Sequence, residues 1–135
     1  MYTHSTRIRV RYSETDQMGY VYYGNYAQYY EVGRVEMLRS LGMDYASMER
    51  DGVMLPVLEL NCKFIKPALY DQELTVVTSV AELPGVKIRF EYELFNETGD
   101  LINTGNATLV FVDMEKKRPC PAPAEFMERL RVHFN

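Results

Sequence analysis

Asp16 is the residue of this chain whose surroundings are best suited to chemistry. It lies in the polar stretch 13–19, between a segment that alternates like a strand and one with helical spacing that begins near Asn25. The first turn of a helix leaves backbone N–H groups unpaired, and its dipole favours negative charge. A carboxylate facing such a terminus can attack a carbonyl carbon or activate water, while the N–H groups hold the oxyanion. The carboxylate and the helix terminus would together provide two parts of a hydrolytic site.

A simpler interpretation of Asp16 stays open. Aspartate is common in turns, where its side chain bonds the backbone two residues on, and Gly19 provides the conformational freedom that such a loop needs. A Ser-His-Asp triad is disfavoured, because His4 and His133 lie near opposite ends of the chain. The histidines and cysteines also lack the spacing of a metal site, so we predict no metal.

The elements that must position these residues follow from hydrophobic periodicity. The expected strands are 7–12, 57–65, 73–81, 86–94 and 101–112. The expected helices are 25–41, 44–50 and one that begins at Pro123. One long helix against a largely antiparallel sheet of about five strands is an α+β architecture. We expect the sheet to wrap around the helix.

The long helix carries signals for its start, its end and its buried face. Asn25 is a candidate N-cap, Gln28 stands where it would complete a capping box, and Gly42 suits the left-handed residue past the helix end. Spacings of three and four predict one apolar stripe, formed by Tyr26, Tyr29, Tyr30, Gly33, Met37 and Leu41. Charged residues elsewhere on the helix predict surface salt bridges among Glu31, Arg34 and Glu36.

Tyrosines are concentrated at the start of this helix, where six of the chain's eleven fall between positions 20 and 30. Aromatic side chains at helical spacing usually belong to the core, so Tyr26 and Tyr30 are expected to pack against the sheet. The three that precede the helix are available to line a substrate pocket instead: Tyr20, Tyr22 and Tyr23.

The composition is that of a globular protein with one ordinary domain. Its 135 residues leave no room for a second core, so we expect a single domain over residues 1–135. The formal net charge of −4 disfavours general binding to nucleic acid. No apolar run approaches the roughly 18 residues that cross a bilayer, and the N-terminus lacks a signal peptide. A cytoplasmic protein with reduced Cys62 and Cys120 is therefore expected.

A longer pattern around Asp16 resembles a known family. Residues 11–26 read RYSETDQMGYVYYGNY, residues 30–38 read YEVGRVEML, and residues 60–68 read LNCKFIKPA. These segments are similar to the 4-hydroxybenzoyl-CoA thioesterase family, and most to the branch that includes the acyl-CoA thioesterase associated with the Tol-Pal system. The resemblance covers nearly the whole chain. It implies the hot-dog fold, in which an antiparallel sheet wraps one long helix.

The resemblance also implies roles for individual residues. Asp16 matches the family's catalytic aspartate, the backbone N–H of Tyr23 matches the group that polarises the thioester carbonyl, and Tyr12 matches a tyrosine near the site. The branch often has histidine where this chain has Tyr23, and a tyrosine with an ordinary pKa of about 10 is a poor general base at neutral pH. Only the backbone role of Tyr23 is therefore carried over. The residues expected to contact substrate around this centre are Gly19, Tyr20, Tyr22 and Asn25.

The implied reaction is hydrolysis of an acyl-CoA thioester to a free acid and CoA, without a separate cofactor. Lys87 and Arg89 are candidate contacts for the CoA phosphates, although a solvated strand face is the simpler interpretation. Some hot-dog enzymes use a helix glutamate as catalytic acid, which keeps Glu31 and Glu36 as alternatives to Asp16.

Assembly and two rival functions complete the expectations. In the family two sheets join at their edges and the active site lies between subunits, so a homodimer or homotetramer is expected. The same fold also serves hydrolysis of acyl groups carried on acyl carrier protein. A non-enzymatic acyl-binding module is the other rival, and it would not require a carboxylate at position 16.

Overall fold

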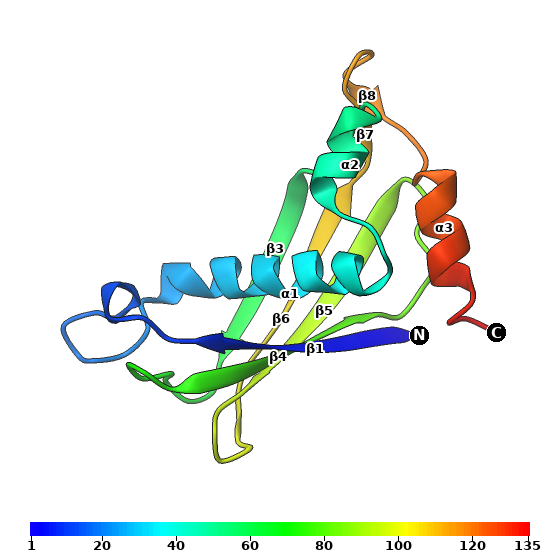
Figure 1. Cartoon of the computed structure of the whole chain (residues 1–135). Helices are drawn as coiled ribbons and strands as arrows, with labels where there is room; N and C mark the ends of the chain where they lie inside the picture. Colours follow the sequence, from blue (N-terminus) through cyan, green and yellow to red (C-terminus); the bar gives the residue numbers. More distant parts are fainter.

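One long helix, α1 (Tyr26–Ser40), lies across a five-stranded sheet in the computed structural model, which describes residues 1–135 (Figure 1). The strands are β1 (Tyr2–Arg9), β3 (Val57–Phe64), β4 (Glu73–Val80), β5 (Lys87–Phe95) and β6 (Leu101–Val110). Their spatial order is β1-β4-β5-β6-β3, and every neighbouring pair is antiparallel. The predicted α+β architecture and the hot-dog fold are confirmed.

Shorter elements close the ends of this layer. Two 3₁₀ turns, η1 (Tyr12–Glu14) and η2 (Tyr23–Asn25), flank the Asp16 loop. The short helix α2 (Tyr45–Arg50) follows α1, and α3 (Ala124–Arg131) ends the chain. A small second sheet contains β2 (Val53–Met54), β7 (Val112–Asp113) and β8 (Arg118–Pro119).

The core lies between α1 and the concave face of the sheet. Strand β5 alternates buried and exposed residues, so that Ile88, Phe90, Tyr92 and Leu94 point toward α1. All six residues of the predicted helix stripe are buried. Gly33 lets the helix approach β4 closely, because a Cβ at this position would lie 2.8 Å from Val76 Cγ1. Gly42 takes the expected left-handed conformation, with φ +79°.

Two strand predictions have the wrong bounds. The first strand covers Tyr2–Arg9 and pairs with β4 from Tyr2↔Val80 to Arg9↔Glu73. It ends before residue 12 because the chain there turns into η1. The last predicted strand divides at Phe111: β6 stays in the large sheet, whereas β7 pairs with β2 and β8.

The predicted capping box is also wrong. The backbone of Asn25 has helical angles, φ −79° and ψ −15°, and its side chain makes no capping bond. Since η2 runs directly into α1, the helical turn starts at Tyr23 and the first unpaired N–H groups lie there. The Asn25 amide donates instead to the Glu14 carbonyl at 2.8 Å.

The predicted salt-bridge set on α1 is only partly present. Glu36 pairs with Arg39. Arg34 is buried, and its guanidinium donates to the Tyr92 hydroxyl at 3.4 Å. No ion pair joins Glu31 to Arg34, because Arg34 points into the core between α1 and β5.

Strand β3 forms one edge of the sheet, and most of it is exposed. Its exposed apolar side chains include Val57, Leu58, Leu60 and Phe64. A long edge strand with exposed apolar residues can pair with another chain. The β3 edge is therefore a candidate surface for pairing with a second subunit.

Candidate active site

The loop that carries Asp16 is a tight turn tied to itself and to the core. An isolated bridge pairs Thr15 with Val21, and the Asp16 N–H donates to the Tyr20 carbonyl at 2.7 Å. Gly19 has φ +80°, a conformation that other residues adopt with strain, and its N–H donates to the Asp16 carbonyl at 3.0 Å. The turn therefore depends on Gly19.

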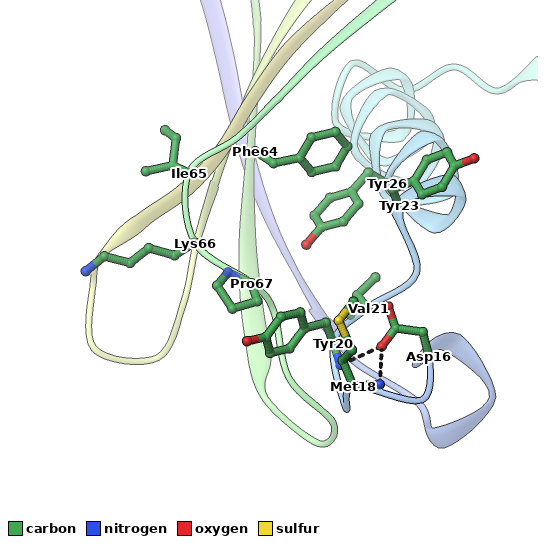
Figure 2. A pocket seen from close by; sticks show the side chains of 10 residues that line it. All are labelled: Asp16, Met18, Tyr20, Val21, Tyr23, Tyr26, Phe64, Ile65, Lys66 and Pro67. Carbon is green, nitrogen blue, oxygen red and sulfur yellow. Dashed lines mark hydrogen bonds between the residues drawn. The ribbon is translucent and has the colours of Figure 1, made fainter.

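The two oxygens of the Asp16 carboxylate have different surroundings. Oδ1 accepts the N–H of Met18 at 2.9 Å and that of Tyr20 at 3.2 Å (Figure 2). No hydrogen bond joins Oδ2 to another protein group. Asp16 therefore caps the turn through Oδ1, as the simpler interpretation holds. Its Oδ2 has no protein partner and is available to a substrate or to water. The bonds to Oδ1 also orient the carboxylate before any substrate binds.

Asp16 contributes to the wall of a largely apolar cavity of about 310 Å³ (Figure 2). The cavity lies between the start of α1 and the chain that leaves β3, and its aromatic walls are Tyr20, Tyr23, Tyr26 and Phe64. The rings of Tyr26 and Phe64 meet edge to face, with centroids 5.2 Å apart. Burial raises the pKa of Tyr26, so its hydroxyl stays protonated at neutral pH.

The helix terminus supplies a donor beside this cavity. Tyr23 is the first residue of η2, and its backbone N–H has no acceptor in the protein. The Tyr23 side chain is 66% exposed. Tyr23 and Asp16 line the same cavity, so a carboxylate and the first residue of a helical turn border one space.

Other residues predicted for the site lie outside this cavity. Tyr12 is 77% exposed and packs edge-on against Tyr70 at 5.5 Å. Together with Gly19 it lines a separate, more polar hollow on which Asp16 also borders. Tyr22 and Asn25 do not line the apolar cavity, and neither do Glu31 and Glu36. Lys87 and Arg89 lie on the opposite sheet face, in a hollow beside the turn between β4 and β5.

The sequence did not reveal one wall of the cavity, nor the burial of one acidic residue near it. Phe64, Ile65, Lys66 and Pro67 close the cavity from the side of β3. The alternation of apolar residues in 57–65 predicted a strand, but it could not show that the strand's end lies against α1. Glu14 is buried beneath the loop, although its charge predicts an exposed residue.

The surroundings contain no obvious place for a metal ion, since no three potential ligands among histidine, cysteine, aspartate and glutamate come together. None of the helices has the length and apolar character required to span a membrane.

Comparisons with known proteins identify the family of this chain. The family model of the thioesterase-like superfamily matches residues 10–130. YneP of Bacillus subtilis, provisionally named an acyl-CoA thioesterase, is 37% identical over 119 residues, which are 88% of this chain and 86% of YneP. The acyl-CoA thioester hydrolase YbgC of Escherichia coli is 27% identical over 124 residues, 92% of each chain, and is consistent with the expected branch.

Among solved structures, DHNA-CoA thioesterase from Staphylococcus aureus superposes with a TM-score of 0.93 at 34% sequence identity. The superposition covers 98% of this chain and 91% of that enzyme. The match to the family model runs from residue 10, before the Asp16 loop, to residue 130 in α3, so it includes every element that forms the cavity. This chain belongs to the thioesterase-like superfamily, as the pattern around Asp16 predicted.

Proposed function

We propose that this protein hydrolyses acyl-CoA thioesters to a free carboxylic acid and CoA, with Asp16 as its central catalytic residue. One observation carries the proposal: the Asp16 carboxylate has one oxygen held by two N–H groups and one without a partner, in the wall of an apolar cavity. The names of YneP, YbgC and the DHNA-CoA enzyme support a CoA thioester as substrate.

The geometry suggests how the reaction proceeds. The acyl group packs against the aromatic walls, and the thioester oxygen accepts the free N–H of Tyr23, which stabilises the oxyanion as it forms. In a nucleophilic route, Oδ2 bonds to the carbonyl carbon, the C–S bond breaks and CoA leaves as a thiolate; water then hydrolyses the anhydride. In a general-base route, Asp16 takes a proton from water while the water oxygen adds to that carbon; the tetrahedral intermediate then collapses, the C–S bond breaks, and the CoA thiolate leaves and takes up the proton held by Asp16.

The active form is proposed to be a homodimer, or a tetramer built from two dimers, joined along β3. This edge is unpaired and its exposed side chains are mostly apolar. Phe64 belongs to the same strand and to the cavity wall, so pairing at β3 brings a second subunit close to the site. The partner would then close the open side of the cavity.

We expect cationic side chains to hold the CoA phosphates. Lys66 lines the cavity, and its ammonium group extends away from Asp16, where it lies 3.4 Å from Asp100 (Figure 2). Lys66→Ala should raise KM with kcat nearly unchanged, because it removes binding that is equal in ground and transition states.

The double variant Lys87→Ala/Arg89→Ala should raise KM by less, since both residues lie outside the cavity. Steady-state kinetics at two salt concentrations measure both effects. An unchanged KM in the double variant would show that Lys87 and Arg89 do not contact CoA and are ordinary solvent-exposed charges.

We also propose that the protein is cytoplasmic and that its reaction needs no cofactor. Both cysteines are free thiols, which suits the reducing cytoplasm. The proposed reaction needs an activated carboxylate and an oxyanion donor, and it requires neither a metal nor a redox cofactor.

A substrate screen tests the proposal directly. Short, medium, long and aromatic acyl-CoAs are incubated with the protein, and release of the free CoA thiol is followed. At least one acyl-CoA should be turned over, and the same acyl groups on acyl carrier protein should be poorer substrates. Binding of acyl-CoA without thiol release would indicate a non-enzymatic module, and a preference for the carrier protein would indicate the other hydrolase.

A further inference from the structure

We propose that Glu14 is a positioning residue for this hydrolysis, whose buried side chain holds the Asp16 loop against the N-terminal turn of α1. This inference rests on the proposed function, because it assigns Glu14 a task in the same site. Glutamate is rarely buried without a partner, yet only 7% of Glu14 is exposed. Its polar partners lie in the segment just before Asp16 and at the start of α1.

The Glu14 carboxylate joins two segments that lie fifteen residues apart in the sequence. Oε1 accepts the Tyr29 hydroxyl at 3.0 Å and the Arg11 N–H at 2.8 Å. Oε2 accepts the Arg11 guanidinium at 3.3 Å. Tyr29 is buried in α1, and burial together with the bond to Glu14 raises its pKa. The phenol therefore remains a hydrogen-bond donor to Glu14 throughout the neutral range.

The main chain of Glu14 makes a second connection to the same helix start. Its carbonyl accepts the Tyr22 N–H and the Asn25 side-chain amide, each at 2.8 Å. Tyr22 directly precedes Tyr23, whose N–H is the proposed oxyanion donor, and Asp16 follows Glu14 by two positions. Glu14 thus provides a short, bonded route between the catalytic carboxylate and that donor.

This connection should affect the chemical step more than substrate binding. The cavity walls are formed in part by residues after β3, which Glu14 does not touch. A shift of the loop would leave those walls in place while it misaligns Asp16 and Tyr23. Misplacement of a catalytic group by about 1 Å can lower the rate by ~10²-fold. Loss of the Tyr29–Glu14 bond should therefore lower kcat with a smaller change in KM.

Tyr29→Phe tests this with Tyr92→Phe as a matched control. Both substitutions remove one hydroxyl from a buried tyrosine, and the Tyr92 hydroxyl bonds Arg34 away from the cavity. We expect both variants to lose thermal stability to a similar extent. Only Tyr29→Phe should lower kcat, by roughly 10- to 100-fold. Equal kcat in the two variants, with equal losses of stability, would overturn the proposal and leave Glu14 a structural residue.

Variants of Glu14 provide the rescue test. Glu14→Gln keeps an oxygen that can accept the Tyr29 hydroxyl, so kcat should stay close to the parent value, whereas Glu14→Ala should resemble Tyr29→Phe. If Glu14→Ala fails to fold, the Tyr29→Phe and Glu14→Gln results still decide the matter. Asp16→Asn, measured in parallel, separates the two claims. Parental activity in Asp16→Asn would refute the proposed mechanism, while its inactivity beside a fully active Tyr29→Phe would refute only the role of Glu14.

Discussion

Asp16→Asn is expected to lower kcat by roughly 10²–10⁴-fold, the range for loss of a positioned acid or base, with a much smaller change in KM. Asparagine keeps an oxygen that can accept the N–H groups of Met18 and Tyr20, so the turn should persist. The position of Oδ2 becomes an amide NH₂, which neither attacks a carbonyl carbon nor takes a proton from water. Thiol release from the best acyl-CoA measures the effect, and thermal melts verify that the variant is folded.

Tyr23→Phe is the matched control for this prediction. The role proposed for Tyr23 uses its backbone N–H, and its side chain is 66% exposed, so removal of the hydroxyl should change kcat little. Parental turnover by Asp16→Asn would show that the proposed mechanism is wrong. Loss of turnover in folded Tyr23→Phe would show that the hydroxyl itself participates, in place of the histidine common in the related branch.

Leu60→Glu should abolish both assembly and most of the activity. Leu60 lies on the β3 edge and is 43% exposed in the isolated subunit, so the fold tolerates a charge there. In a dimer joined along β3, each subunit would place a glutamate in the new strand pair, and burial of a charge there is strongly unfavourable. We expect a fall in kcat/KM of at least roughly 10²-fold, because the cavity would lose the wall that a partner provides.

Light scattering at micromolar concentration measures the assembly. The parent should have a mass of at least twice 15.7 kDa, and Leu60→Glu should approach the mass of one chain. Val132→Glu places the same charge on another exposed apolar residue, near the C-terminus, and should remain assembled and active. A monomeric parent would contradict the proposed dimer, and a monomeric but fully active Leu60→Glu would contradict a site completed by the partner.

The sequence was most informative where the physical signal is local. Alternation of apolar residues in β5 and the spacing of the stripe on α1 record which side of each element is buried, and both were predicted correctly. The left-handed conformation of Gly42, which was predicted from its place just past the end of α1, also follows from neighbouring residues. The placement of Asp16 in a turn before a helix start was likewise predicted from residues close to it in the sequence.

Predictions failed where a side chain bonds to a residue distant in the sequence instead of taking the role that its neighbours indicate. Asn25 looks like a helix cap, yet its amide is used by the Glu14 carbonyl, because η2 extends the helical turn forward to Tyr23. Arg34 looks like a surface cation, yet it points inward to the Tyr92 hydroxyl on β5. Neither partner is visible in the spacing of residues along α1.

By itself, the sequence determined the order of the main elements and the buried faces of α1 and β5, and it singled out Asp16 as the candidate catalytic residue. Only the tertiary structure decided which residues share a cavity with it. It brought the end of β3 against the start of α1, buried Glu14 beneath the loop, and placed Lys87 and Arg89 on the opposite face of the sheet. The reason is physical: periodicity reports how each segment meets its own surroundings, whereas contacts between distant segments depend on sheet order and register, which no single segment encodes.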